Sequence, residues 1–341
     1  MQDAKREIRS LLPEELEAEL VRLGEPAYRA GQVFSWLGKG IRSFDEMTNL
    51  PAALRDKLRE SFALAAPVRL RKQVSAQDGT VKYLWGLADG NAVECVVMRY
   101  SYGNTVCISS QVGCRQGCVF CASTGLGFVR NLSAGEMLAE VLFSQADSGA
   151  KLSGVVLMGI GEPLENYDEV LRFLRLVNHP RGMNIGMRHI SLSTCGLVPA
   201  MERLAEERLQ LTLSVSLHAP DDETRQKLMP IARRYDMDTL MNACSAYFRR
   251  TERRISFEYA LIRGVNDSPR QAELLAGLMR RTHGHVNLIP LNRVEKSPLV
   301  PGDTRKFAEL LSAKGVNVTV RRRLGADIEA ACGQLRRKEA T

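Results

Sequence analysis

The chain has 341 residues, of which 45% are hydrophobic and 25% are charged, as in an ordinary globular protein with a full core. No apolar run approaches the roughly 20 residues that span a membrane, and the N-terminus lacks the apolar stretch of a signal peptide, so we expect a cytoplasmic enzyme without membrane segments. The formal net charge of +8 makes a polyanionic partner plausible, because Lys and Arg gain affinity by displacing counterions from phosphates.

Residues 1–64 are predicted to form a small helical domain. Leucines recur at helical spacing from Leu11 to Leu23. A second apolar group, from Phe34 to Ile41, follows helix-breaking Pro and Gly residues. This part of the chain is interpreted as an accessory domain.

Residues 65–100 change to a pattern of short strands. Val81, Tyr83 and Trp85 alternate with other residues, as in a β-strand, before the turn sequence Ala-Asp-Gly-Asn at 88–91. A second strand is expected directly after this turn. The segment is therefore predicted to be a β-hairpin linker.

From residue 101 to residue 322, apolar strand-like runs alternate with amphipathic helices, a pattern that favours a parallel sheet with right-handed crossovers. One helix start is marked by Ser133 and Glu136, whose spacing is that of a capping box. A late strand at 316–320 leads into a C-terminal segment, 323–341. The sequence thus predicts an α/β core of six strand–helix units, with strands at 106–109, 155–158, 190–193, 211–217, 255–261 and 286–291.

Three of the eight cysteines, Cys114, Cys118 and Cys121, stand in one short run. A 4Fe-4S cluster held by protein alone takes four Cys thiolates, so three thiolates leave one iron open to a substrate or cofactor. Tetrahedral zinc is the alternative, but it would need a fourth ligand, and neither flanking segment offers a second Cys-x2-Cys or His-x3-His pair. So many cysteines without a small, loop-rich scaffold indicate metal and redox chemistry in a reducing compartment.

Polar and glycine residues follow several of the predicted strands. In parallel α/β proteins the functional residues lie just beyond the carboxyl ends of the strands, so these residues are expected to face one common mouth. A carboxylate such as Glu162 suits an ammonium group or a ribose hydroxyl. Each serine, taken alone, could equally form a hydrogen bond at a strand end as bind a ligand. His218, taken alone, would be interpreted as a core histidine. The candidate nucleoside-binding residues are Gly161, Glu162, Ser193, Ser216, Leu217, His218 and Asn292.

The Cys-x3-Cys-x2-Cys spacing, with an aromatic residue before the last Cys, resembles the radical S-adenosylmethionine (SAM) superfamily, in which the open iron chelates the amino and carboxylate groups of SAM. The sequence Gly-Ile-Gly-Glu-Pro at 159–163 looks like the motif that holds the methionyl amine there. Gln-Val-Gly at 111–113 and Asp-Ile-Glu-Ala-Ala-Cys-Gly-Gln-Leu at 327–335 are similar to the RlmN/Cfr group of RNA methyltransferases, over residues 94–335 and more weakly in the N-terminal domain. The resemblance implies a partial (β/α)6 barrel and an RNA-binding role for residues 1–64.

The same resemblance implies catalytic roles for three further residues. In this family one SAM methylates a thiol that corresponds to Cys332, and a second SAM, cleaved reductively at the cluster, gives a 5′-deoxyadenosyl radical that removes a hydrogen from the S-methyl group. The resulting carbon radical adds to an adenine of the RNA. Glu94 matches the general base that then takes the ring proton, and Cys107 matches the thiol that releases the product by forming a disulfide. Taken alone, Cys107 would be interpreted as a buried strand cysteine and Glu94 as part of a solvated strand face.

The resemblance also implies the partners. The group methylates 23S rRNA on C2 or C8 of an adenosine, and its C2 branch also methylates adenosine 37 of tRNA; Val112 and the segments 130–132 and 161–163 favour C2. A one-electron reductant such as flavodoxin or ferredoxin and a monomeric state are expected. The alternatives are a different radical SAM enzyme, or an iron–sulfur protein that binds RNA or senses redox state without turnover. The remaining cysteines are interpreted as packing residues: Cys95, Cys195 and Cys244.

Overall fold

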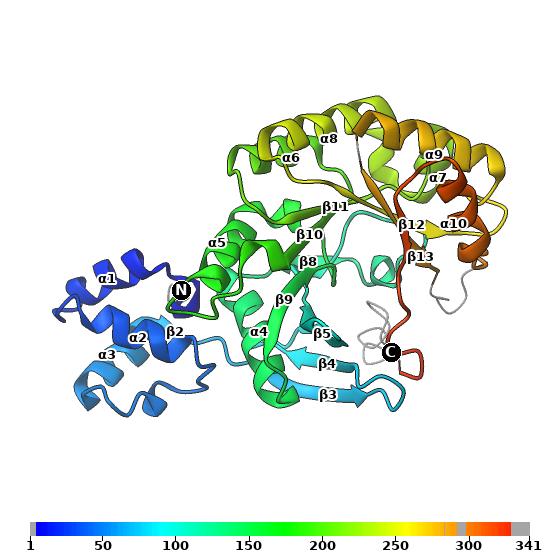
Figure 1. The fold of residues 1–341 in the computed structure, drawn as a ribbon. Helices are drawn as coiled ribbons and strands as arrows, with labels where there is room; N and C mark the ends of the chain where they lie inside the picture. The colour runs from blue at the N-terminus through cyan, green and yellow to red at the C-terminus, as the bar shows by residue number, and fades with distance from the viewer. Residues whose placement is uncertain (1–4, 283, 292–297, 329–341) are drawn as a thin grey trace.

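The computed structural model describes residues 5–282, 284–291 and 298–328. Within these ranges the chain forms one large mixed sheet with helices around it, and a smaller helical lobe at the N-terminal end (Figure 1). The large sheet has ten strands in the order β14-β13-β12-β11-β10-β9-β6-β5-β4-β3. Its parallel part consists of β6 (Gly103–Cys107), β9 (Leu152–Leu157), β10 (Ile190–Thr194), β11 (Thr212–Ser216), β12 (Ser256–Leu261), β13 (His285–Pro290) and β14 (Val318–Val320).

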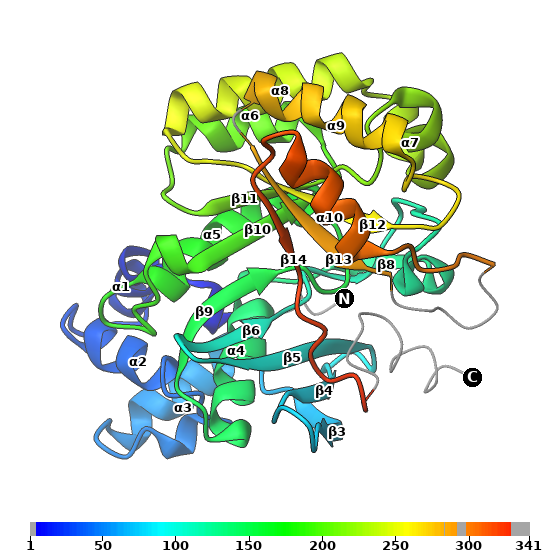
Figure 2. The same cartoon turned by 45° about the vertical axis from the view of Figure 1, so that its right-hand side comes forward.

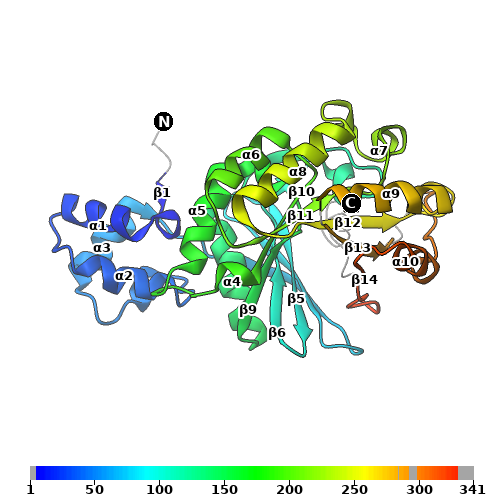
Figure 3. The same cartoon turned by 45° about the horizontal axis from the view of Figure 1, so that its top comes forward.

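The six predicted core strands and the late strand are all present, and each pairs in parallel with its neighbour. The connecting helices lie on the outer side of the curved sheet (Figure 3). In the described ranges the edge strands β3 and β14 do not pair with each other, so the barrel stays open and the predicted α/β fold with a partial barrel is confirmed. None of the described helices is long and apolar enough to cross a membrane. The helices are α4 (Ala134–Ser148), α5 (Tyr167–Asn178), α6 (Val198–Glu206), α7 (Asp222–Leu228), α8 (Met237–Thr251), α9 (Pro269–Thr282) and α10 (Thr304–Ala313).

The segment predicted as a hairpin linker contains three strands, and they extend the large sheet instead of standing apart from it. β3 (Val68–Val74), β4 (Val81–Gly86) and β5 (Ala92–Tyr100) pair antiparallel in sequence order, and β5 also pairs with β6. Strand alternation points Tyr83 and Trp85 towards α4, where the Trp85 Nε1–H donates to Ser144 Oγ at 3.1 Å. The other face of these strands, which includes Glu94, is the inner face of the open barrel.

The N-terminal lobe contains α1 (Pro13–Arg22), α2 (Arg29–Leu37) and α3 (Ala52–Ser61), with the short parallel pair β1 (Arg6–Glu7) and β2 (Phe62–Ala63). The predicted helical unit is therefore present. It contacts the core through the backbone N–H of Gly135, which donates to Ser10 Oγ at 2.8 Å, and through an ion pair between Arg172 and Glu15. Short 3-10 turns complete the chain: η1 (Ile8–Ser10), η2 (Phe44–Glu46), η3 (Ala122–Leu126), η4 (Pro163–Asn166), η5 (Met187–His189) and η6 (Pro230–Arg233).

After β14 the chain turns back across the open side of the barrel towards β4 (Figure 2). The backbone N–H of Arg321 donates to the carbonyl oxygen of Leu288 at 2.8 Å, which keeps the start of this crossing on the sheet. Leu324 then packs against a small apolar cluster on the inner face that contains Val96, Met98 and Cys107. The described C-terminal residues therefore lie against the strands that carry Cys107.

Glu140 is a carboxyl group inside the core, on the side of α4 that faces the sheet. Its Oε2 atom accepts a hydrogen bond from Cys95 Sγ at 2.9 Å and one from the backbone N–H of Ser109 at 3.1 Å. Burial raises the pKa of Glu140 to about 8, and these two donors only partly offset that rise. Cys95 is buried as predicted, and its thiol helps to satisfy this carboxyl group.

We expect Glu140→Gln to make the protein less sensitive to alkaline pH. Because the pKa of Glu140 rises from 4.5 to about 8 on folding, the unfolded chain loses this proton first, and the stability contributed by Glu140 falls between pH 4.5 and pH 8. The fall should reach a few kcal/mol, since one unit of pKa shift corresponds to about 1.4 kcal/mol. The measurement is the difference in denaturant midpoint between variant and wild type from pH 5 to 8.5. A difference that stays constant over this range would show that Glu140 does not titrate there.

Candidate active site

A two-stranded ribbon holds the loop that carries the three clustered cysteines. β7 (Gln111–Gly113) and β8 (Phe128–Asn131) pair antiparallel at its two ends. Gly113 has a φ of +83°, and a Cβ atom at this position would collide with the carbonyl oxygen of Gly127. The same carbonyl accepts a hydrogen bond from the backbone N–H of Cys114 at 3.0 Å. The start of the cysteine loop is thus fixed by backbone geometry that only glycine permits.

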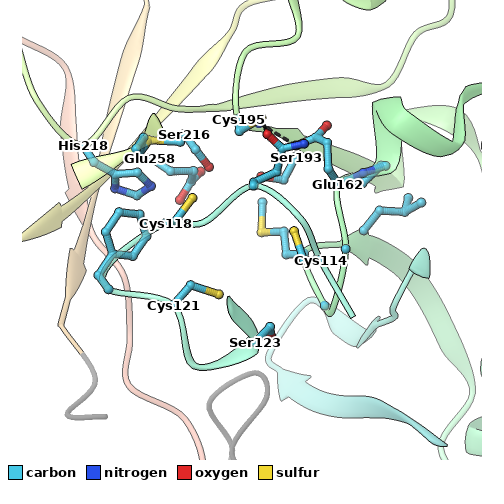
Figure 4. Close-up of a pocket in the computed structure, with 18 of the residues that line it drawn as sticks. Cys114, Cys118, Cys121, Ser123, Glu162, Ser193, Cys195, Ser216, His218 and Glu258 are labelled. Atoms are coloured by element: carbon cyan, nitrogen blue, oxygen red, sulfur yellow. Dashed lines mark hydrogen bonds between the residues drawn. The ribbon is translucent and has the colours of Figure 1, made fainter. Parts of the chain in front are cut away.

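The thiols of Cys114, Cys118 and Cys121 line one side of a cavity at the carboxyl ends of the parallel strands (Figure 4). Two hydrogen bonds to the carbonyl oxygen of Cys118 hold the loop, from the backbone N–H of Cys121 at 3.1 Å and from Thr124 Oγ1 at 3.0 Å. The three cysteines that are close together in the sequence therefore also face the same cavity. No disulfide joins the described cysteines.

The donor set of this loop fits a 4Fe-4S cluster. Burial raises the pKa of Cys114 to about 11 and that of Cys118 still further, so these thiols need a bound cation to ionise at neutral pH. Among the described residues no three Cys, His, Asp or Glu side chains form a group that could hold a single metal ion. Three soft thiolates in one loop are the ligand type that iron–sulfur clusters take.

Glu162 lies across the cavity from the cysteines and is almost fully buried. Its Oε2 atom accepts the backbone N–H of Cys195 at 2.7 Å, and Oε1 accepts that of Leu164 at 3.0 Å. Burial raises the pKa of Glu162, and the two backbone donors oppose that rise. The carboxylate is therefore held rigidly, and it can accept an ammonium group through its remaining lone pairs.

The glycines before Glu162 serve mainly to let two loops approach each other. A Cβ atom on Gly159 would lie 2.5 Å from the carbonyl oxygen of Ile108, and one on Gly161, where φ is +108°, would lie 2.6 Å from Gln111 Cβ. On sequence grounds Gly161 is a candidate nucleoside-binding residue. In the structure Gly161 does line the cavity, but its lack of a side chain is explained by the contact with Gln111.

His218 is a buried histidine whose ring is oriented by the backbone. Its Nδ1 atom accepts the N–H of Ala260 at 2.9 Å, so the ring hydrogen is assigned to Nε2. Burial and the nearby Arg225 lower the pKa of His218 to about 3. Its ring packs on Phe120, with the centroids 4.4 Å apart. His218 thus offers the cavity a neutral hydrogen-bond donor and an aromatic surface.

Ser193 and Ser216 line the cavity as predicted, but Leu217 does not. Leu217 is fully buried in the core, its backbone N–H donates to the carbonyl oxygen of Glu258 at 3.0 Å, and its own carbonyl accepts Arg225 Nε at 3.2 Å. Both backbone groups are therefore engaged within the protein. Leu217 directly follows Ser216, and its side chain packs in the core because successive side chains alternate between the two faces of a strand.

Sequence reasoning missed Glu258, which lines the cavity from the middle of β12. Ser256 Oγ donates to its Oε1 at 3.1 Å, and Asn287 Nδ2 donates to its Oε2 at 2.8 Å. Burial raises its pKa, and the cation of Arg321, another cavity residue, opposes that rise. A carboxylate inside the apolar run Ile-Ser-Phe-Glu-Tyr-Ala-Leu was the signal that could have identified it.

Arg225 and Cys195 were also missed as parts of the site. Arg225 is fully buried behind the strand ends, where its Nη2 donates to the carbonyl oxygen of Cys195 at 2.8 Å. Cys195 is buried, as expected of a packing residue, but it also lines the cavity, and its Sγ lies 3.4 Å from Gln116 Oε1. Arg225 places a cation close to Cys118, one of the three thiols that would carry negative charge in a cluster.

Glu94 and Cys107 lie on the inner face of the sheet, beside the cavity residues. Cys107 of β6 pairs with Val96 of β5, and Glu94 comes two residues before Val96 in the same strand. The side chains of Cys107 and Glu94 therefore point to the same face of the sheet. Glu94 Oε2 forms an ion pair with Lys82 Nζ at 2.9 Å, and both side chains are buried. The predicted residues Asn292 and Cys332 lie outside the described residues, and their roles stay predictions.

Two family models match the chain. Residues 108–275 match the radical SAM superfamily, and residues 7–64 match the ribosomal RNA large subunit methyltransferase N-terminal domain. The first match covers the cysteine loop and most of the parallel sheet. The second covers almost all of the N-terminal lobe.

Relatives at high identity extend over nearly the whole chain. A probable dual-specificity RNA methyltransferase RlmN from Desulforamulus reducens is 52% identical over 98% of this chain and 97% of its own length. One with the same description from Alkaliphilus oremlandii is 50% identical over 98% of both chains.

A solved structure is similar over the same extent. The crystal structure of a radical SAM methyltransferase from Sphaerobacter thermophilus has 44% sequence identity and a TM-score of 0.91, covering 96% of this chain and 98% of its own. The family models, the relatives and the solved structure therefore all indicate the same family. The chain belongs to the RlmN branch of the RlmN/Cfr family of radical SAM RNA methyltransferases.

Proposed function

We propose that this enzyme methylates C2 of a specific adenosine in 23S rRNA, and adenosine 37 of tRNA, through an S-methylcysteine at Cys332. The observation that carries the proposal is that the C-terminal segment, which precedes Cys332 in the sequence, packs through Leu324 on the face that bears Cys107 and Glu94. Two relatives described as probable dual-specificity RNA methyltransferases support the pair of RNA substrates.

The cavity residues would position SAM for this chemistry. The three thiolates would hold the 4Fe-4S cluster, and the cavity would hold SAM. Together they would supply the one-electron cleavage of SAM that yields a hydrogen-abstracting radical. Two SAM molecules would be consumed in each turnover. Glu162 would accept the methionyl ammonium, and His218 and the serines would bind the nucleoside. Glu258 and Arg321 add an acceptor and a cation at the same cavity, where both can orient polar groups.

The inner-face residues would complete the reaction. Cys332 would hold the methyl group as a thioether. After one hydrogen is removed from this group, its carbon would bond to the adenine carbon, and the adduct radical would give up one electron to the oxidised cluster. Glu94 takes the proton from the adenine carbon, and the thiolate of Cys107 attacks the sulfur of Cys332. The S–C bond would then break with its electron pair going to the methylene carbon, which takes up a proton to become the methyl group. The methylated RNA would leave, and a Cys107–Cys332 disulfide would remain that an external thiol must reduce.

Regiochemistry separates this proposal from its nearest alternative, methylation of C8 in the manner of the Cfr branch. Val112 and the segments 130–132 and 161–163 resemble the C2 branch. Val112 is buried in the ribbon next to the cysteine loop. We also propose a cytoplasmic monomer that receives electrons from a flavodoxin or ferredoxin.

Mass spectrometry of anaerobically purified protein tests the proposal. In the wild type, the peptide that contains Cys332 is expected to carry one methyl group, which the Cys332→Ala variant lacks. Incubation with SAM, reductant and a 23S rRNA fragment should yield 2-methyladenosine after nuclease digestion, and Cys107→Ala should retain RNA covalently. An unmodified Cys332 in protein with a complete cluster would refute the thiol relay, whereas 8-methyladenosine would refute only the C2 assignment.

A further inference from the structure

The C-terminal crossing segment ends on the turn between β3 and β4. The carboxylate of Asp327 accepts two hydrogen bonds there, from Ser75 Oγ to Oδ1 at 2.6 Å and from the backbone N–H of Ala76 to Oδ2 at 2.8 Å. In the opposite direction, Asp78 of the turn accepts the backbone N–H of Gly325 on its Oδ2 atom at 2.8 Å. The two carboxylates thus form a reciprocal anchor between the turn and the segment.

The turn itself is well defined. The backbone N–H of Ser75 donates to the carbonyl oxygen of Thr80 at 2.8 Å, and the Thr80 N–H donates to Asp78 Oδ1 at 2.9 Å. Gly79 closes the turn with a φ of +70°. Asp78 therefore reaches the segment from a rigid support, and the bonds it accepts are charge-assisted and stronger than neutral ones.

Both carboxylates are ionised at neutral pH. Partial burial alone would raise the pKa of Asp78, but the donors of Gly325 and Thr80 outweigh it and lower the pKa to about 2. The hydroxyl of Ser75 lowers the pKa of Asp327. The anchor is consequently at full strength throughout the pH range in which the enzyme would work.

The position of the anchor limits where Cys332 can go. Leu324 packs on the cluster that contains Cys107, and Cys332 follows Asp327 by five positions. Five residues span at most about 18 Å, because an extended chain advances about 3.3–3.6 Å per residue. Without the anchor the last backbone hydrogen bond to the sheet would be that of Arg321, and the reach would roughly double.

We infer that Asp78 and Asp327 are positioning residues, which hold the C-terminal segment on the β3–β4 turn so that Cys332 meets Cys107 and the cofactor cavity at high effective concentration. This inference rests on the proposed function. It assigns to the β3–β4 turn a part in catalysis, although the turn does not line the cavity.

Three variants test the anchor. Asp327→Ala removes both of its acceptors, Asp78→Ala removes the acceptor for Gly325, and Asp327→Asn keeps an acceptor while removing the charge. Asp168→Ala is the matched control, because Asp168 is an exposed aspartate that forms an ion pair with Arg203, far along the chain from the anchor. Melting curves confirm that each variant is folded.

The first readout is independent of turnover. In protein that is produced without iron and shown by mass spectrometry to carry an unmethylated Cys332, mild oxidation should join Cys107 to Cys332, and trypsin should cleave slowly after Arg323. Asp327→Ala and Asp78→Ala are expected to lower the yield of this disulfide, and to raise the cleavage rate, by about tenfold. Asp327→Asn should lie between these variants and wild type.

The second readout is the rate of methylation of Cys332, which should fall by about the same factor in the alanine variants. If wild type and Asp327→Ala give the same disulfide yield and the same cleavage rate, the anchor is refuted, whatever the methylation result. If wild-type Cys332 never gains a methyl group although the disulfide assay responds as expected, the proposed function fails and the positioning of the segment stands.

Discussion

Replacing Cys118 with alanine is expected to abolish SAM cleavage while leaving the protein folded. The Cys118 thiol lies on the cavity wall, but the hydrogen bonds that shape its loop go to its backbone carbonyl, from Cys121 N–H and Thr124 Oγ1. The substitution therefore removes a proposed cluster ligand without removing the contacts that hold the loop. Loss of a residue that only supports a metal ligand typically costs 10–100-fold, so we expect a loss greater than about a hundredfold here.

The measurements for this variant are iron and sulfide content, the visible absorption of the reconstituted protein, and 5′-deoxyadenosine formed with a chemical reductant. Cys244→Ala is the control, because Cys244 is a fully buried thiol in α8 that does not line the cavity. It should bind iron and cleave SAM as wild type does. A Cys118→Ala protein that kept its iron and its cleavage rate would remove Cys118 from the ligand set.

Lys82→Met is expected to destabilise the fold more than any exposed charge substitution. Lys82 Nζ and Glu94 Oε2 are 2.9 Å apart, and their side chains are 0% and 3% exposed. Removal of Lys82 leaves a buried carboxylate without its ion-pair partner, which costs about 3–5 kcal/mol in comparable cases. The free energy of unfolding of the iron-free protein, from denaturant titration, measures the effect.

A double variant separates the contribution of the ion pair from the effects of the two single substitutions. Lys82→Met combined with Glu94→Leu should recover much of the lost stability, because well-packed apolar residues can replace a buried ion pair at little cost. Lys227→Met is the exposed counterpart, since Lys227 pairs with Glu223 at the surface, and it should leave the denaturant midpoint unchanged. A double variant no more stable than Lys82→Met would mean that the two charges are not coupled.

The core strands were predictable because each is a short apolar run between helix signals. β10 and β12 were placed within a residue or two, and the capping box at Ser133 begins α4 as expected, with Ser133 Oγ accepting the Glu136 N–H at 3.1 Å. The pairing of β5 with β6 was not predictable. It depends on tertiary contacts across the sheet, which alternation within a single strand does not reveal.

Site residues were predictable where they belong to a sequence motif. They were not predictable where only their burial in the folded protein distinguishes them. Glu162 and the cysteine loop belong to recognisable patterns, and the structure places them around one cavity. Glu258 and Arg225 are polar residues within apolar surroundings, and only the fold shows that both border the cavity region. Leu217 was among the candidate nucleoside-binding residues, but adjacent residues at the end of a strand face different surroundings, and Leu217 is buried in the core.

The hydrogen bond between Ser75 and Asp327 joins residues that are 252 positions apart. During synthesis on a ribosome the β3–β4 turn emerges long before Asp327, because all strands from β4 to β14 are translated between them. This contact therefore forms only after the whole large sheet has been translated, and a chain truncated before Asp327 lacks it. The anchor is thus a late step of cotranslational folding, which joins the C-terminal crossing segment to a turn that has already been made.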